Sequence, residues 1–477
     1  MCKNSIDSRL KSNIMQKENH ISFHMPGHKG RSPFAGDLAD FDTTELDGTD
    51  NLADPKKEIQ SIEREISKTI GSQQTMISVN GASAALMACL LGTFQPNDKI
   101  VLSRDVHKSV YSALAYGRFQ PVYLYPKKET HYGIYPSGWE MKELESLRKK
   151  HPDIKGLVLT HPNYYGICPD IDEMVRFCQR NDILLIIDEA HGSHLPFTGE
   201  EGPKSAVSMK ADALVHSTHK TLSALNQGAV IHILSNRVDS KRIKRHLNMV
   251  QTTSPSYPIL LSVEESYRKV DAVRKAVQLW RDGKEKVRET IKKTRFKLVE
   301  DFPECRNMVF DPAKLWIDKG GIDNITGLLA NQYGIDIEME DEYTMVAMAG
   351  VGTLATDYHH LADALVQIDR EYRTYDGERR DNECMAQRKI EEKTRTFPKN
   401  KIRMPIWEAV FQPTEVLPPD QAIGKIAGEF VMAYPPGLPI IVPGEEISQE
   451  LGRCLKHMDQ SRWIGLDQGG RISVIKE

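Results

Sequence analysis

Short apolar runs and segments with helical periodicity alternate along the first 300 residues of the chain. In the first helical segment, apolar residues recur at positions 59, 62, 66 and 70, which lie on one face of a helix. The predicted strands lie at residues 76–79, 99–103, 121–125, 156–160 and 183–188, at the run that begins at 213, and after 226. The predicted helices lie at residues 55–70, 83–91, 140–150, 171–180, 237–250 and 262–300. Alternation of this kind predicts an α/β domain with a mainly parallel sheet.

Two of the predicted strands end in residues that can do chemistry. The apolar run Ile183 to Ile187 is followed directly by Asp188, and the run that begins at Ala213 ends in Ser-Thr-His-Lys-Thr at positions 217–221. The 32 positions between Asp188 and Lys220 leave room for a crossover and a second parallel strand. Because the C-terminal ends of parallel strands open toward a ligand crevice, we expect both side chains to face a ligand.

These residue types suit pyridoxal 5'-phosphate held as a Schiff base on Lys220. A partly desolvated amine is a nucleophile toward aldehydes, and Ser217, Thr218 and His219 add hydrogen-bond donors for a phosphate. A carboxylate such as Asp188 keeps a pyridinium nitrogen protonated, so that the ring can act as an electron sink. The predicted catalytic residues are therefore Lys220, His219 and Asp188. The alternative is a solvated aspartate and a surface lysine at the start of two loops.

The turn Asn-Gly-Ala-Ser at residues 80–83 lies between a predicted strand and a predicted helix. Backbone N–H groups and the helix dipole favour an anion at such a place, so Ala82 and Ser83 are the predicted phosphate contacts. A plain helix N-cap at Ser83 is the alternative.

The segments Asp188-Glu-Ala-His-Gly-Ser-His194 and Ser217-Thr-His-Lys-Thr221 resemble the cofactor motifs of the ornithine/lysine/arginine decarboxylase family. Further matches follow the same order in the chain: His24-Met-Pro-Gly-His-Lys29, Asn80-Gly-Ala-Ser83, Ser103-Arg-Asp-Val-His-Lys-Ser109, Thr253-Ser-Pro-Ser-Tyr257 and Tyr434-Pro-Pro-Gly-Leu-Pro439. The resemblance implies the aspartate-aminotransferase-like fold of pyridoxal phosphate enzymes, with a mostly parallel seven-stranded sheet flanked by helices and a smaller α+β C-terminal domain. We expect an N-terminal arm near the active site at residues 1–55, a cofactor-binding domain at 56–300 and the small domain at 301–477.

The resemblance also implies roles for single residues. His107 would stack on the pyridine ring, and the small Ala190 would let the ring approach closely. His191 would contact the cofactor or the substrate, and Asn163, Tyr164 and His194 are more distant candidates. The expected cofactor-binding residues are Ala82, Ser83, His107, Asp188, Ala190, His191, Ser217, His219 and Lys220. The segment at residues 252–257 would reach the cofactor across a subunit boundary, which implies a homodimer or higher homo-oligomer with shared active sites.

The reaction expected from the resemblance is decarboxylation of arginine, lysine or ornithine to the amine and CO2, in polyamine or diamine synthesis. Acids in the segment Glu45 to Asp50 are candidates for binding the cation of the substrate, and Lys220 or His219 for returning a proton. The chain lacks the N-terminal wing domain of the large acid-induced members, so we expect the shorter biosynthetic type. Two alternatives stay open: an aminotransferase or acyl-transferring synthase, with Arg403 binding the substrate carboxylate, and a regulatory protein that keeps the cofactor.

Charge and composition argue against several other classes of function. A net charge of −3 gives no general attraction to nucleic acid or anionic membranes, and the basic run 237–250 lacks interleaved aromatic residues. Seven cysteines without paired spacing, no apolar core of a signal peptide and no apolar run of about 18 residues predict a cytoplasmic protein with reduced thiols. No metal site is expected, because Pro26-Gly27 interrupts the helix that would bring His24 and His28 to one face.

Overall fold

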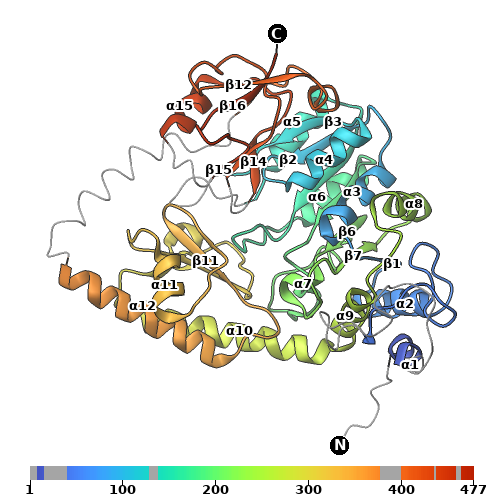
Figure 1. Ribbon diagram of the computed structural model, residues 1–477, viewed down its shortest axis with the longest axis horizontal. Coiled ribbons are helices and arrows are strands. Elements are labelled where there is room, and N and C mark those ends of the chain that lie inside the picture. The colour runs from blue at the N-terminus through green and yellow to red at the C-terminus, as the bar shows by residue number, and fades with distance from the viewer. Residues whose placement is uncertain are drawn as a thin grey trace, which may run out of the picture. The chain divides into compact units, whose positions relative to one another are not determined.

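The computed structural model describes residues 8–15, 40–127, 138–375, 399–433, 437–457 and 463–476 (Figure 1). The chain divides into two compact units. The first comprises residues 1–93, 186–197 and 205–274, and the second comprises residues 94–185, 198–204 and 275–477. The motif His24 to Lys29 and most of the charged stretch 372–401 lie outside the described residues.

A seven-stranded sheet is the central element of the fold. Its strands are β1 (Gln74–Ser78), β2 (Lys99–Ser103), β3 (Gln120–Leu124), β4 (Ile154–Thr160), β5 (Leu184–Asp188), β6 (Ala213–His216) and β7 (Ala229–Ile233), in the order β1-β7-β6-β5-β4-β2-β3. Strands β5 and β6 pair in parallel, as β2 does with β3 and β4, whereas β7 is antiparallel to β1 and β6. The prediction of a mostly parallel sheet is confirmed, and β7 is its antiparallel member.

The helices of the first unit are α1 (Arg9–Met15), α2 (Glu58–Ile70), α3 (Gly81–Thr93), α7 (Thr218–Thr221), α8 (Ser240–Val250) and α9 (Tyr257–Arg268). Helix α2 follows the predicted apolar spacing. All four periodic isoleucines of α2 are buried. Helix α3 packs against α8 (Figure 1), and a Cβ on Gly92 would lie 2.4 Å from the Cα of Ile243, so this close approach requires glycine.

The prediction of one helix over residues 262–300 is wrong. The segment forms the end of α9 and a separate helix, α10 (Val270–Ile291), and Lys269 between them has φ −94° and ψ 40°. Because both helices keep the same apolar period, the sequence pattern does not reveal a break of one residue.

The remaining elements lie in the second unit. Its further helices are α4 (Lys108–Gly117), α5 (Met141–Lys150), α6 (Asp172–Arg180), α11 (Ile325–Tyr333), α12 (Ala355–Tyr375), α14 (Ile406–Ala409) and α15 (Gln449–His457). Its further strands are β8 (Lys297–Leu298), β9 (Lys314–Asp318), β10 (Met339–Glu340), β11 (Thr344–Met348), β12 (Thr414–Leu417), β13 (Val431–Ala433), β14 (Leu438–Ile441), β15 (Trp463–Ile464) and β16 (Ile472–Ile475). They form an antiparallel sheet β10-β11-β9-β8, a pair β12-β16 and a three-stranded sheet β14-β13-β15.

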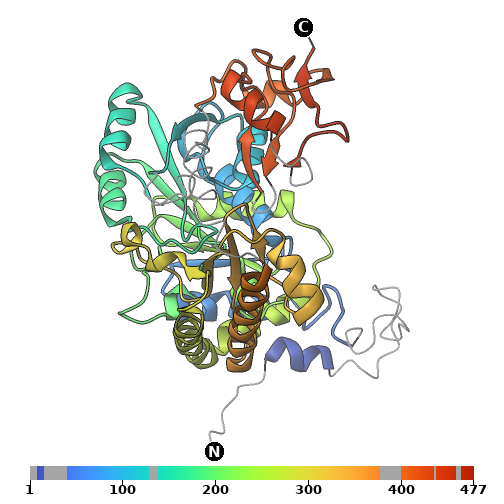
Figure 2. The same ribbon diagram turned by 90° about the vertical axis from the view of Figure 1, so that its left-hand side faces the viewer.

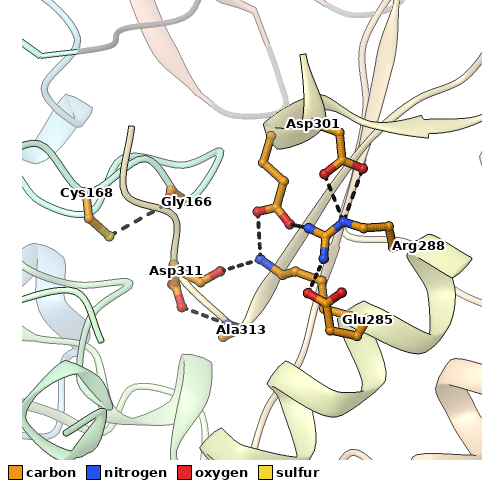
Figure 3. A network of polar contacts seen from close by, with 9 residues as sticks. Gly166, Cys168, Glu285, Arg288, Asp301, Asp311 and Ala313 are labelled. Carbon is orange, nitrogen blue, oxygen red and sulfur yellow. Dashed lines mark hydrogen bonds and ion pairs between the residues drawn. The ribbon is translucent and has the colours of Figure 1, made fainter. Parts of the chain in front are cut away.

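One core of the second unit lies between α10, α12 and the sheet β10-β11-β9-β8. The two long helices lie side by side in both views (Figures 1 and 2), with Trp280 of α10 fully buried beside Tyr358 of α12. A polar network holds the outer side of α10. Figure 3 shows Arg288 between Glu285 and Asp301, with its Nε 2.8 Å from Asp301 Oδ1, while Lys284 lies 3.1 Å from Glu300. These pairs tie α10 to the short helix η3 (Val299–Asp301).

No helix among the described residues is long and apolar enough to cross a membrane. Four of the cysteines, Cys89, Cys168, Cys178 and Cys305, are buried thiols outside any disulfide.

Candidate active site

Lys220 lies in α7, a single helical turn that follows β6. The strand before it is fully buried, and the backbone N–H of Lys220 donates to the carbonyl of Ser217 at 3.1 Å. The half-buried side chain reaches His191, with 2.9 Å between Lys220 Nζ and His191 Nε2. An ammonium donates at this distance to a neutral imidazole, which can take up the proton that the amine must lose to become a nucleophile.

Parallel pairing of β5 and β6 brings the two predicted motifs together. Asp188, the last residue of β5, is in register with Val215 of β6, five residues before Lys220. His191 follows three residues after Asp188 and is buried. The two strands are parallel neighbours in the sheet, which the 32 positions between Asp188 and Lys220 allow.

Asp188 is a buried carboxylate at the C-terminal end of β5. Its Oδ1 accepts a hydrogen bond from the N–H of Ala190 at 3.2 Å. Within the described part of the chain, no lysine, arginine or histidine lies within ion-pair distance of Asp188. Because buried carboxylates in proteins are normally paired, this arrangement suits the protonated ring nitrogen of a ligand.

The predicted phosphate contacts Ala82 and Ser83 lie in the first turn of α3, and their role stays a prediction. Helix α3 begins at Gly81, whose φ is +78° and whose N–H donates to Gln227 at 2.9 Å. The N–H groups of the first helical turn have no carbonyl partner inside the helix, so those of Ala82 and Ser83 suit a phosphate. The alternative of an N-cap at Ser83 is wrong, because the helix starts two residues earlier and the side chain of Ser83 is exposed.

His219 and Ser217 form a polar group beside Lys220. His219 Nδ1 lies 3.2 Å from the carbonyl of Gly228 and 3.3 Å from Ser217 Oγ. Burial lowers the pKa of His219, an effect that the hydrogen bond to Gly228 partly opposes and the charge of Lys220 reinforces. The imidazole is therefore neutral near pH 7, with Nδ1 donating to Gly228 and Nε2 left as an acceptor.

Three of the predicted site residues lie in the second unit, and their roles toward the cofactor stay predictions. His107 caps α4, and its Nδ1 accepts from the N–H of Ser109 at 3.2 Å. Asn163 Oδ1 accepts hydrogen bonds from the backbone N–H groups of Tyr165 and Ile167, a pattern typical of turns. Tyr164 donates to Glu338 at 2.6 Å.

Two of the charged candidates make contacts within the protein, and their proposed roles toward the substrate stay predictions. Asp50 was a candidate for binding the substrate, but its carboxylate accepts from the backbone N–H groups of Lys56, Lys57 and Ile59 at the start of α2. Arg403, the candidate carboxylate binder of an aminotransferase, forms an ion pair with Glu446 at 2.5 Å. Both side chains therefore have partners within the protein.

Glu189 lies in the motif Asp188 to His194, but the sequence-based predictions assigned it no role. Glu189 is fully buried, and its Oε2 lies 2.8 Å from Nε2 of His216, which is also fully buried. A second acidic residue directly after Asp188, at the end of the apolar strand β5, was the available signal, because a charged residue is almost never fully buried without partners.

The comparisons with known proteins agree over most of the chain. Residues 13–343 match the family model of the Orn/Lys/Arg decarboxylase major domain, and residues 392–465 match the model of the C-terminal domain of the same family. The arginine decarboxylase of Bacillus subtilis strain 168 is 30% identical over 466 residues, which cover 92% of this chain and 91% of that relative.

Solved structures show the same fold. The lysine decarboxylase of Francisella novicida superposes with a TM-score of 0.83 at 19% identity and covers 98% of this chain and 81% of its own. The ureidoglycine-glyoxylate aminotransferase of Bacillus subtilis has a TM-score of 0.53 at 15% identity, over 70% of this chain and 89% of its own. The predicted aspartate-aminotransferase-like fold with a small C-terminal domain is confirmed.

Proposed function

The chain belongs to the Orn/Lys/Arg decarboxylase family, and on that premise we propose that it decarboxylates arginine to agmatine with pyridoxal 5'-phosphate bound at Lys220. Decarboxylation of a basic amino acid follows from the family. The choice of arginine over lysine and ornithine is the finer part of the proposal, and it is supported by the relative named arginine decarboxylase. A role in polyamine synthesis would follow from that product.

The observation that carries the proposal is the pair of Lys220 and Asp188 at the ends of two adjacent parallel strands. Asp188 offers a buried carboxylate without a cation of the described chain, Lys220 offers a half-buried amine, and the first turn of α3 offers N–H groups. These three features fit the ring nitrogen, the aldehyde carbon and the phosphate of the cofactor. Bound pyridoxal phosphate supplies an electron-withdrawing ring that weakens the bonds at the α-carbon of the substrate.

The residues of the chain have distinct tasks in this reaction. Lys220 would hold the cofactor covalently, and Asp188 would keep a proton on its ring nitrogen. His191 Nε2 accepts the proton that Lys220 loses, since the two atoms are 2.9 Å apart. His219 orients the turn through its hydrogen bond to Gly228, and its Nε2 can hold a proton near Lys220. His107 would stack on the ring, as the resemblance implies.

A homodimer with shared active sites belongs to the same proposal. The segment that the resemblance places at the subunit boundary lies at the start of α3 in this chain, where the N–H of Thr252 donates to Asn80 at 3.2 Å. Its side chains at 252–254 are exposed, so they are accessible to a second copy.

The proposal is tested by measuring CO2 release from arginine, lysine and ornithine, each supplied separately to protein loaded with pyridoxal phosphate. We expect release from arginine and a loss of at least about 10³-fold in Lys220→Ala, because the covalent attachment is removed. Lys241→Ala, on the exposed side of α8, is the matched control and should keep full activity. Release from lysine or ornithine alone would contradict the choice of arginine. Cofactor uptake without CO2 release from any of the three would contradict decarboxylation.

A further inference from the structure

A buried polar network lies around Glu189, the residue directly after Asp188. Glu189 Oε1 accepts from the N–H of Ala206 at 2.8 Å, and its Oε2 accepts from Ser205 Oγ at 2.8 Å and lies 2.8 Å from His216 Nε2. The side chains of Glu189 and His216 are both fully buried. Three donors therefore compensate for the loss of water around this carboxylate.

The protonation of His216 is set by its surroundings. Burial lowers the pKa of His216 to about 3, so that the imidazole is neutral near pH 7. Because its Nε2 faces a carboxylate, Nε2 carries the hydrogen and donates to Glu189, and Nδ1 is left as an acceptor. Tyr267 OH lies 3.3 Å from Nδ1, and burial raises the pKa of Tyr267, so the phenol stays protonated and donates. Each member of the chain Tyr267, His216, Glu189 thus has a defined donor or acceptor role.

The network connects the elements that carry the candidate active site. Glu189 follows β5, His216 ends β6 and Tyr267 lies on α9. The ring of His232 on β7 packs edge-on against His216 at 4.8 Å, and its Nδ1 lies 3.1 Å from Thr75 of β1. Asp188 and Ser217 are the chain neighbours of Glu189 and His216. The bond between Glu189 and His216 therefore joins the two strand ends without involving a ligand.

We propose that Glu189, His216 and Tyr267 are positioning residues that hold Asp188 and Lys220 at the separation required by pyridoxal phosphate. The proposal rests on the proposed function above. A rigid ring must meet the carboxylate and the amine at the same time. Strand ends that move independently would have to be ordered during binding, and this cost would weaken the affinity. Since none of the three residues is assigned a contact with the cofactor, their effect acts through their chain neighbours.

The first test is Glu189→Gln, measured as the dissociation constant of pyridoxal phosphate in a titration of the apoprotein. Glutamine keeps the shape of the side chain, but its amide cannot accept hydrogen bonds from Ser205, Ala206 and His216 together. Its NH2 group would face one of these donors instead of accepting from it. We expect binding to weaken about tenfold or more, the usual size of such supporting contacts. We also expect the ¹⁵N chemical shifts of His216 to change, because its Nε2–H loses a charged acceptor.

The matched control is Glu264→Gln. Glu264 is another buried carboxylate of the same unit, and it accepts from Ser8 Oγ at 2.5 Å. Its loss should lower the unfolding temperature and leave the dissociation constant within twofold of the wild type. If Glu189→Gln and Glu264→Gln lower the unfolding temperature equally and both bind the cofactor like the wild type, the network is only structural and the inference is overturned.

Tyr267→Phe is a milder variant for the case in which Glu189→Gln does not fold. It removes only the hydroxyl that donates to His216, and we expect a weaker but measurable loss of cofactor affinity. Unchanged affinity in Tyr267→Phe, or in Glu189→Gln, overturns the inference while leaving the proposed function intact. Wild-type protein that takes up no pyridoxal phosphate would instead refute the proposed function, and the inference with it.

Discussion

Burial determines the protonation state of individual side chains in this protein. His216 is the clearest case, because its imidazole is enclosed and yet surrounded by hydrogen-bonding partners. Its low pKa makes it a fixed donor to Glu189 at physiological pH, in contrast to the usual role of histidine as a switch near neutrality.

The burial of His216 predicts a pH dependence of stability. In the unfolded chain this imidazole takes up a proton below about pH 6.5, whereas in the folded protein it does so only near pH 3. Acid therefore favours the unfolded state, and the stabilisation that His216 gives is present above pH 6.5 and lost as the pH falls. The free energy of unfolding of the wild type, relative to His216→Gln, should decrease by about 2 kcal/mol between pH 7 and pH 5.

Chemical denaturation at several pH values measures this difference. His359→Gln, which replaces an exposed histidine on α12, is the control and should change the free energy of unfolding by less than about 0.5 kcal/mol. A constant difference between the wild type and His216→Gln across the range would show that His216 is not held neutral.

At the scale of elements, local sequence patterns predicted the positions of strands better than they predicted which residues contact each other. The strand at 99–103 was predicted at its observed bounds, and those of β3, β4 and β5 lie within two residues of the prediction, because a buried parallel strand is a continuous apolar run. The break at Lys269 was missed because the helical period continues through it. The bond between Glu189 and His216 was missed because it depends on the pairing of β5 with β6, which no local pattern encodes. The stacking role of His107 was expected from the resemblance alone and stays a prediction.

Helix α2 offers a prediction about its N-terminus. Burial acts to raise the pKa of Asp50, but hydrogen bonds from the backbone N–H groups of Lys57 and Lys56 lower it overall, so the carboxylate is charged at neutral pH and caps the helix. Asp50→Ala should lower the free energy of unfolding by about 1–2 kcal/mol for the lost cap. A further 1 kcal/mol or so is expected because residue 50 has φ +64°, which alanine tolerates poorly.

Asp47→Ala is the matched control, since the side chain of Asp47 is 97% exposed and pairs with the exposed Lys57. Its free energy of unfolding should change by less than about 0.5 kcal/mol. Equal effects of the two substitutions would contradict a capping role for Asp50.

At the scale of the whole molecule, a buried ion pair connects the parts of the chain that match the two family models. Arg104 follows β2, and its guanidinium lies 3.3 Å from Glu445, with both side chains almost completely buried. Arg104 also donates to the carbonyls of Pro439 and Ile440, and Asn400 donates to Glu445 at 2.9 Å. Two motifs of the sequence, one with Arg104 and one ending at Pro439, therefore meet inside the second unit.

Glu445→Gln should destabilise the protein strongly. The substitution leaves a buried guanidinium without its counter-charge, which typically costs about 3–5 kcal/mol of unfolding free energy. The neighbouring Glu446→Gln breaks only the half-exposed pair with Arg403 and should cost less than about 1 kcal/mol. Thermal or urea unfolding of the two variants compares them directly, and similar losses would refute the structural importance of the buried pair.

The first unit is assembled from three separate stretches of the chain, and this has a consequence for biosynthesis. Gln74 of β1 pairs with Ile233 of β7, and the residues from 94 to 185 between them belong to the other unit. Contacts so distant in sequence form slowly and only after the whole intervening chain exists. During synthesis, the chain must therefore extend to about residue 274 before the unit that contains Lys220 can fold completely. Until β7 has been synthesised, the backbone groups of β1 have no partner strand. A chaperone that covers this strand would be most useful at that stage.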